Sequence, residues 1–212
     1  MIKLLIVDDH ELVRTALTCM LDSISGVQVV GQAANGEEAV QKSSLLQPDV
    51  VLMDVRMPGI GGVEATRRIL RHQPETRVIA LTAYDDDPFP NRLLQAGAMG
   101  YITKDSNLDE MLNAIRKVHS GQRYISVKIA QELALKRFSG DADTSPFDLL
   151  SEREMQIALM IIHCQKVAEI SAKLHLSPKT VNSHRYNIFE KLGIDSDVAL
   201  THLALRWGLI DA

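Results

Sequence analysis

The sequence of 212 residues is poor in cysteine, in aromatic side chains and in long apolar runs. Its two cysteines, Cys19 and Cys164, are too few for a disulfide framework and lack metal-ligand spacing. We therefore expect both to be small buried hydrophobic side chains in a reducing cytoplasm. No apolar run approaches the roughly 18 residues of a membrane span. The N-terminal apolar run is short and ends in acids, so we expect neither a membrane anchor nor export.

The chain also lacks an excess of basic residues. Its 23 Lys and Arg are outnumbered by 27 Asp and Glu, which gives a net charge of −4. This balance excludes a generally basic coat for nucleic acid, but it leaves room for a local basic surface. A hydrophobic content of 46% is ordinary for a folded globular protein, and the length suits one large domain or two small ones.

Short apolar segments alternate with helical patterns in residues 1–120. The segments are nearly continuous in apolar character, which is typical of strands buried on both faces. They span residues 3–9, 27–33, 49–55, 77–83 and 100–104. Strict alternation of strand and helix predicts an α/β domain, with a parallel sheet between two layers of helices.

The pattern changes after residue 120. Residues 121–146 are predicted to be a linker that includes one further helix and then a polar, turn-prone stretch. Residues 147–212 show only helical patterns, which predicts an all-α domain. Ser151 is followed by Glu in the spacing of a capping box, and Ser177 precedes a proline at the expected start of another helix.

Acidic side chains end two of the predicted strands. Asp8 and Asp9 close the first strand, and Asp54 closes the third. The carboxyl ends of parallel strands share one edge of the sheet, where ligands bind in doubly wound folds. Three carboxylates at this edge repel one another and need a hard cation, for which Mg²⁺ (or Mn²⁺) is suited. The backbone carbonyl of Arg56 would add a ligand.

Thr82 and Lys104 follow the fourth and fifth predicted strands at the same edge. A hydroxyl and an ammonium facing the carboxylates can bind the oxygens of a transferred phosphoryl group. Asp54 is then the predicted nucleophile, which forms an aspartyl-phosphate. The alternative, a solvated acid at a strand end, fits each carboxylate taken singly, whereas the joint pattern favours the site.

Residues 166–192 fit a helix-turn-helix. At about 100° per residue, Val181, Ile188 and Leu192 share the inner side of the second helix. Polar side chains on the outer face and at the N-terminus are the predicted DNA contacts: Lys179, Thr180, Asn182, Ser183, Tyr186, Asn187 and Lys191. Basic residues are few here, so non-specific affinity should be weak and tight binding should need a dimer. A helical hairpin that binds protein is the alternative.

Residues 1–120 resemble the receiver domain of two-component response regulators, through LLIVDDH, VVLMDVRMPGIGG, LTA and GYITK. The resemblance implies a flavodoxin-like five-stranded parallel sheet of order 2-1-3-4-5 and phosphotransfer from a histidine kinase to Asp54. It also implies that Asp8 and Asp9 bind metal, and that Thr82 and Tyr101 are switch residues. On phosphorylation, Thr82 would move toward the phosphoryl group and Tyr101 would turn inward.

Residues 147–210 resemble the LuxR/NarL-type DNA-binding domain, through LSEREMQIALMI, EISAKLHLSPKTVNSHRYNIFEKLGI and SDVALTHLA. Together the two halves are similar to NarL/FixJ response regulators. DPFPNRLLQAG, GQRYIS, CQKV and SPKTVNSHRYNIFEKL are most similar to the GacA/UvrY/LetA group of global regulators.

The resemblance to this group implies a BarA/GacS-like sensor histidine kinase and a double-stranded DNA promoter as partners. Phosphorylation would favour a homodimer, and RNA polymerase would be a further partner at genes for small regulatory RNAs. The last predicted helix, near residues 197–207, would either form the dimer surface or close the domain core.

Three functions follow from these patterns. The predicted one is a transcription factor that is switched by phosphorylation, with self-catalysed phosphotransfer and dephosphorylation at Asp54 as its only chemistry. A metal-dependent phosphatase or phosphotransferase would need a second general acid and a substrate cap, for which we find no pattern. An adaptor whose C-terminal half binds protein is the third.

Overall fold

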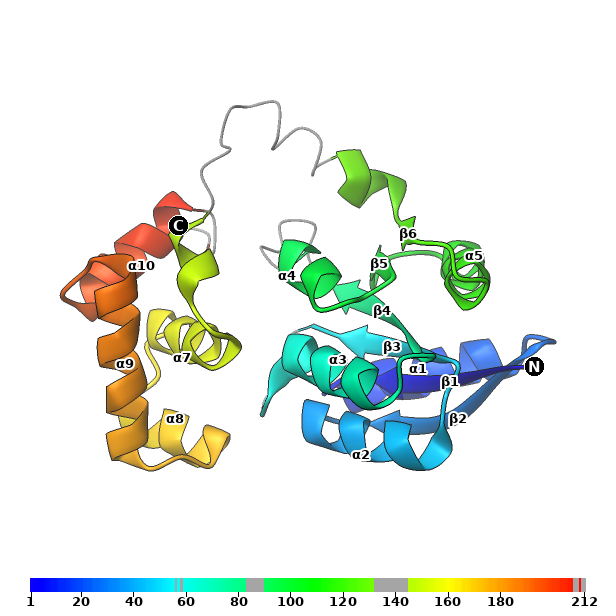
Figure 1. The fold of residues 1–212 in the computed structure, drawn as a ribbon, viewed down its shortest axis with the longest axis horizontal. Coiled ribbons are helices and arrows are strands. Elements are labelled where there is room, and N and C mark those ends of the chain that lie inside the picture. The colour runs from blue at the N-terminus through cyan, green and yellow to red at the C-terminus, as the bar shows by residue number, and fades with distance from the viewer. Residues whose placement is uncertain (56, 58, 83–89, 132–144, 208–209, 211–212) are drawn as a thin grey trace. The chain divides into compact units, whose positions relative to one another are not determined.

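In a computed structural model, the chain forms two compact units, Met1–Leu135 and Lys136–Ala212. The structure describes residues 1–55, 57, 59–82, 90–131, 145–207 and 210. The first unit is a sheet flanked by helices, and the second consists of helices (Figure 1). This confirms the predicted order of an α/β domain and an all-α domain. Within the described residues, no helix is both long and apolar enough to span a membrane.

The first unit is built on a parallel sheet of order β2-β1-β3-β4-β5-β6. Its strands are β1 (Ile2–Val7), β2 (Val27–Ala33), β3 (Val50–Asp54), β4 (Arg77–Thr82), β5 (Gly100–Thr103) and β6 (Tyr124–Ile125). The first five confirm the predicted strands and their order. β6 was not predicted, since a strand of two residues has no periodicity to detect. It pairs with β5, with Gly100 opposite Tyr124 and Tyr101 opposite Ile125.

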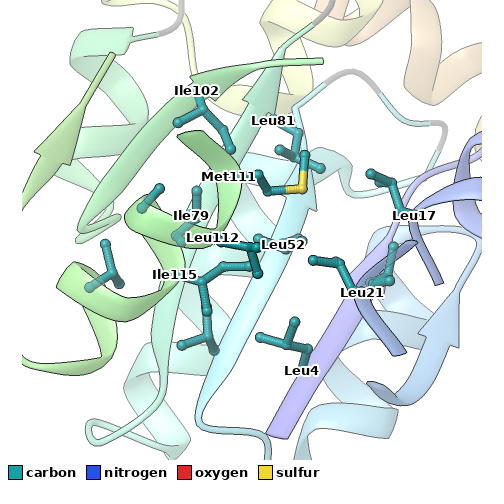
Figure 2. Close-up of a cluster of buried hydrophobic side chains, with 14 of the residues drawn as sticks. Leu4, Leu17, Leu21, Leu52, Ile79, Leu81, Ile102, Met111, Leu112 and Ile115 are labelled. Carbon is teal, nitrogen blue, oxygen red and sulfur yellow. The ribbon is translucent and has the colours of Figure 1, made fainter. Parts of the chain in front are cut away.

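Helices cover both faces of this sheet. They are α1 (Glu11–Asp22), α2 (Gly36–Leu46), α3 (Gly61–His72), α4 (Pro90–Gln95) and α5 (Leu108–His119). Side chains of α1 and α5 share one buried cluster with the strands, which Figure 2 shows, and those of α2 and α3 share another. Along β3, Val50 and Leu52 belong to the first cluster, and Val51 and Met53 to the second. Burial on both faces explains why the strands are nearly continuous in apolar character.

The second unit packs helices around one core. Its elements are η1 (Pro146–Leu149), α7 (Glu152–Ile162), α8 (Val167–Leu174), α9 (Pro178–Leu192) and α10 (Asp197–Arg206). The capping box at Ser151 is present, and Ser177 accepts a hydrogen bond from the Thr180 N–H, as the sequence predicts. Val181 and Ile188 are fully buried on α9. Leu192, the third residue predicted on the inner side of α9, is only half-buried, and Phe189 is buried beside Ile188 instead.

Both cysteines are exposed free thiols, so the prediction that they are buried was wrong. On α1, the helical period places Leu17 and Leu21 against the sheet, and Cys19 between them therefore faces outward. Cys164 follows α7 in a turn and has a φ of +58°, outside any packed helical face.

Candidate functional site

Two buried carboxylates meet one ammonium at the carboxyl-terminal edge of the sheet. Asp8 follows β1 and Asp54 ends β3, and these strands are neighbours, with Val7 opposite Met53. Lys104, which follows β5, has its Nζ 2.6 Å from Asp8 Oδ2 and 2.8 Å from Asp54 Oδ2. The side chains of Asp8 and Asp54 are 0% and 4% exposed. The sheet thus brings together three charged groups that are far apart in the sequence.

Lys104 is a permanent cation in this arrangement. Burial by itself would lower the pKa of its ammonium, but hydrogen bonds and charge interactions with Asp54 and Asp8 outweigh that effect and raise the pKa above its usual value. The ammonium therefore stays protonated at neutral pH and offsets part of the negative charge at this edge.

Asp9 and His10 complete an acidic cluster around the same point. Ligand atoms of Asp8, Asp9, His10 and Asp54 all lie within 4.8 Å of one another. His10 Nδ1 lies 2.9 Å from Asp9 Oδ1 and 3.3 Å from Asp8 Oδ1. Three carboxylates against one lysine leave negative charge to be neutralised, and their oxygens are the donors that Mg²⁺ or Mn²⁺ prefers. The donor set fits such a cation. Arg56, whose carbonyl is a predicted ligand, lies outside the described residues.

The connection after Asp54 passes so close to this residue that a side chain is excluded at position 62. A Cβ added to Gly62 would lie 2.1 Å from the Asp54 carbonyl oxygen. The Gly62 N–H also donates to the Val55 carbonyl at 3.2 Å. Sequence reasoning missed this residue, although the paired glycines at 61 and 62 were the available signal.

The predicted switch residues lie on neighbouring strands. Thr82 ends β4 opposite Thr103 of β5, and Tyr101 lies opposite Ala80. Thr82 and Tyr101 are 2% and 1% exposed, so both side chains lie in the interior. The Thr82 carbonyl accepts a hydrogen bond from the Lys104 N–H at 2.6 Å. The backbone therefore joins the residue at the end of β4 directly to the lysine of the acidic edge.

The outer side of α9 is open to solvent. Tyr186 is 72% exposed. The other residues predicted on this surface are exposed or partly exposed: Lys179, Thr180, Asn182, Ser183 and Asn187. A three-residue turn from His175 to Ser177 separates α8 from α9, and His175 has a φ of +52°. This arrangement is a helix-turn-helix with a polar surface on its second helix.

Two basic side chains of α9 are paired within the second unit. Arg185 donates to both carboxylate oxygens of Asp197, at 2.8 and 2.6 Å. Lys191 Nζ lies 2.6 Å from Glu154 Oε2. Burial would raise the pKa of Glu154, but hydrogen bonds from Lys191 and Ser151 lower it overall. Lys191, a predicted DNA contact, is thus tied to α7, while Lys179 is exposed at the N-terminus of α9.

The two units match two protein families. Residues 4–116 match the response regulator receiver domain, and residues 148–204 match the bacterial regulatory proteins of the luxR family.

Similar proteins cover the whole chain. It is 65% identical over 212 residues to the response regulator GacA of Pseudomonas syringae pv. syringae (strain B728a), which covers 100% of this chain and 99% of that protein. It is 53% identical to the response regulator UvrY of Escherichia coli (strain K12), with 100% and 97% covered. The solved complex of the response regulator RcsB with DNA has a TM-score of 0.59 at 25% identity, and the match covers 95% of this chain and 96% of that one.

Proposed function

The chain belongs to the response regulators that join a receiver domain to a LuxR-type DNA-binding domain, and on that premise we propose that phosphotransfer to Asp54 controls its binding to promoter DNA. The observation that carries the proposal is the pairing of Lys104 with Asp8 and Asp54 at the acidic edge. A carboxylate nucleophile, a fixed cation and further acids in one place are the groups that phosphoryl transfer to an aspartate requires.

Asp54 performs the covalent step. One of its carboxylate oxygens attacks the phosphorus of a phosphohistidine, so that an O–P bond forms while the N–P bond breaks. The histidine nitrogen leaves with the electron pair of that bond and takes up a proton. Lys104 and the Thr82 hydroxyl bind the phosphoryl oxygens as charge builds up on them.

A divalent cation is the proposed cofactor, either Mg²⁺ or Mn²⁺. The groups that would hold it are Asp8, Asp9, Asp54 and the backbone carbonyl of Arg56. When bound, the cation neutralises negative charge during the transfer.

Thr82 and Tyr101 are the proposed switch. Phosphorylation adds a charge of about −1.5 to −2 and new acceptor oxygens. The Thr82 hydroxyl then turns toward the phosphoryl group, which frees space that the Tyr101 ring uses on the neighbouring strand. The pairing of β4 with β5, in which Tyr101 lies opposite Ala80, two residues before Thr82, supports this coupling.

The outer surface of α9 is the proposed DNA reader. Lys179 and Thr180 at its N-terminus suit phosphates, and the exposed Tyr186 suits the groove. The remaining proposed contacts are Asn182, Ser183, Asn187 and Lys191. Since the local charge is modest, a homodimer formed on phosphorylation would supply the affinity.

The similarity to GacA and UvrY supports a BarA/GacS-like sensor histidine kinase as the phosphoryl donor. It also supports promoters of small regulatory RNA genes as targets, with RNA polymerase as a further partner. The protein would act in the cytoplasm, where promoter DNA lies.

The first test is intact mass after incubation with acetyl phosphate and Mg²⁺. The wild type and Asp109→Asn, a change of an exposed carboxylate on α5, are expected to gain one phosphoryl group. Asp54→Asn is expected to gain none. Equal uptake by Asp54→Asn would show that the nucleophile is another residue.

The second test compares promoter binding by the phosphorylated and unmodified full chain. Phosphorylated protein is expected to bind more tightly, and Asp54→Asn should not respond to acetyl phosphate. Equal affinity of the two forms would reject the coupling between the units, even if Asp54 is phosphorylated.

A further inference from the structure

We propose that Arg14 is a positioning residue for the acidic edge: it fixes the peptide that joins Asp8 to Asp9 and thereby sets the affinity of this edge for a divalent cation. The inference rests on the proposed function, since it concerns the same edge. It assigns a role to a side chain that touches none of the proposed reacting groups.

The contact is a hydrogen bond from the Arg14 guanidinium to the main chain of Asp8. Arg14 Nη1 donates to the Asp8 carbonyl oxygen at 2.7 Å. The Asp8 N–H donates to the Ala33 carbonyl at 3.1 Å, and Asp8 Oδ1 accepts from the His10 N–H at 2.8 Å. Asp8 is therefore held by its amide, its side chain and its carbonyl. The orientation of that carbonyl fixes the peptide plane from which the chain continues to Asp9.

Arg14 is itself held in place from two sides. Its backbone N–H donates to the His10 carbonyl in the first turn of α1, at 3.1 Å. Its carbonyl accepts a hydrogen bond from the Thr18 hydroxyl at 2.8 Å, and Gln32 of β2 donates to that same hydroxyl at 2.9 Å. The guanidinium thus projects from a helix turn that is anchored to the sheet through Thr18 and Gln32.

The charge of Arg14 acts on Glu38 of α2. The pKa of Glu38 is lowered, chiefly by a hydrogen bond from the Ala34 N–H and by Lys42, with a contribution from Arg14. Toward the acidic edge, Arg14 donates its hydrogen bond to a main-chain carbonyl, that of Asp8. We therefore assign Arg14 to the geometry of the cation ligands rather than to the chemistry at Asp54.

Groups that orient metal ligands without touching the metal change metal affinity by about 10- to 100-fold when removed. Asp9 depends most on this support, because its side chain is 29% exposed and thus less confined than the buried Asp8 and Asp54. Loss of the Arg14 hydrogen bond should therefore weaken cation binding. It should leave the rate at saturating cation nearly unchanged, since Asp54 and Lys104 keep their places.

The experiment uses the full chain and two readouts: direct Mn²⁺ binding followed by electron paramagnetic resonance, and the Mg²⁺ dependence of phosphorylation by acetyl phosphate. Arg14→Gln is expected to raise the Mn²⁺ dissociation constant and the half-saturating Mg²⁺ concentration roughly 10-fold. The rate at saturating Mg²⁺ should stay within about twofold of the wild type. Arg14→Lys keeps the charge but not the planar fork, so its cation affinity should lie between those of the wild type and Arg14→Gln.

Arg77→Gln is the matched control. Arg77 also donates to main-chain carbonyls, those of Pro74 and Glu75 at 2.9 and 2.8 Å, but at the opposite edge of the sheet, where β4 begins. Its cation affinity should equal that of the wild type. A similar loss in Arg77→Gln would mean that general loosening, not positioning, is measured.

Wild-type cation affinity in Arg14→Gln would overturn the inference. Should that variant not fold, Arg14→Lys decides, and wild-type affinity in this variant would overturn the inference equally. If the wild type binds Mn²⁺ but takes up no phosphoryl group, the proposed function fails while the role of Arg14 is still decided by the binding data.

Discussion

The acidic edge of the first unit and the outer surface of α9 differ in how the fold builds them. The acidic edge gathers Asp8, Asp54 and Lys104 from three separate strand ends, and it buries the two carboxylates. The surface of α9 takes its polar side chains from one helix and leaves them in solvent. Chemistry at the edge thus depends on the whole sheet, whereas recognition by α9 depends on local helical spacing. Substitutions at the acidic edge should therefore change the rate of phosphorylation and the geometry of the site. Substitutions on the outer surface of α9 should change the affinity for DNA alone.

The largest effect is expected from Lys104→Met. The change removes the cation shared by two buried carboxylates and a donor to the phosphoryl group, so phosphorylation by acetyl phosphate should slow by about 100-fold. The initial rate of mass gain measures this. Lys117→Met, which removes an exposed lysine near the Tyr124 ring, is the control and should react as the wild type does. A rate for Lys104→Met within threefold of the wild type would remove Lys104 from the proposed chemistry.

A smaller effect is expected from Lys191→Met. This residue crosses the comparison, because it belongs to α9 and also pairs with the buried acid Glu154 of α7. Without Lys191, the carboxylate of Glu154 loses its ion-pair partner, and the second unit should lose about 2 kcal/mol of stability at neutral pH. The fluorescence of Trp207 during urea unfolding reports this loss, since it is the one tryptophan of the chain.

The pH dependence of this loss follows from the lowered pKa of Glu154. A depressed pKa stabilises the fold above the unfolded value of 4.5, and this stabilisation is lost as the pH falls through the folded value. The difference between the wild type and Lys191→Met should therefore shrink as the pH falls below 4.5 and the carboxylate of Glu154 becomes protonated. Lys173→Met, which removes an exposed lysine that donates to Gln165, should show no such pH dependence. If Lys191→Met were less stable than the wild type by the same amount at every pH, the stabilisation would not come from the ion pair of Lys191 with Glu154.

The smallest effect on the fold is expected from Tyr186→Ala. The side chain is 72% exposed, so the stability of the second unit should change by less than about 0.5 kcal/mol. Promoter affinity of the phosphorylated protein should nevertheless fall roughly fivefold, about 1 kcal/mol. Fluorescence anisotropy with a labelled promoter fragment measures the affinity. Unchanged affinity would place the DNA-reading surface elsewhere, while a large loss of stability would mean that Tyr186 supports the core.

Sequence patterns predicted the elements whose signals are local and repeated. The apolar strands, the capping residue Ser151 and the helix start at Ser177 are confirmed because each depends on neighbours in the chain. The grouping of Asp8 and Asp54 also followed from sequence, since parallel strands must end at one edge. The function predicted from these patterns, a response regulator with a DNA-binding domain, is confirmed by the family matches. The individual roles of the site residues stay predictions.

Features that depend on tertiary approach were missed. The close passage of Gly62 over Asp54 and the hydrogen bond of Arg14 to Asp8 join residues through the folded backbone, which no spacing rule encodes. The pair of Lys191 with Glu154 spans two helices for the same reason. Cys19 was assigned to the interior by residue type, although its helical position points it outward.

β6 covers an open side of the sheet. The Tyr124 N–H donates to the Met99 carbonyl at 2.9 Å, and the Ser126 N–H donates to the Tyr101 carbonyl at 3.1 Å. The segment just beyond α5 therefore donates hydrogen bonds to the carbonyl of Tyr101 in β5 and to that of Met99 just before it. Both carbonyl groups would otherwise face solvent. An uncovered strand edge is a template on which a second molecule can add a strand. A protein cut directly after α5 would present that edge and tend to self-associate, whereas the intact chain carries its own cover.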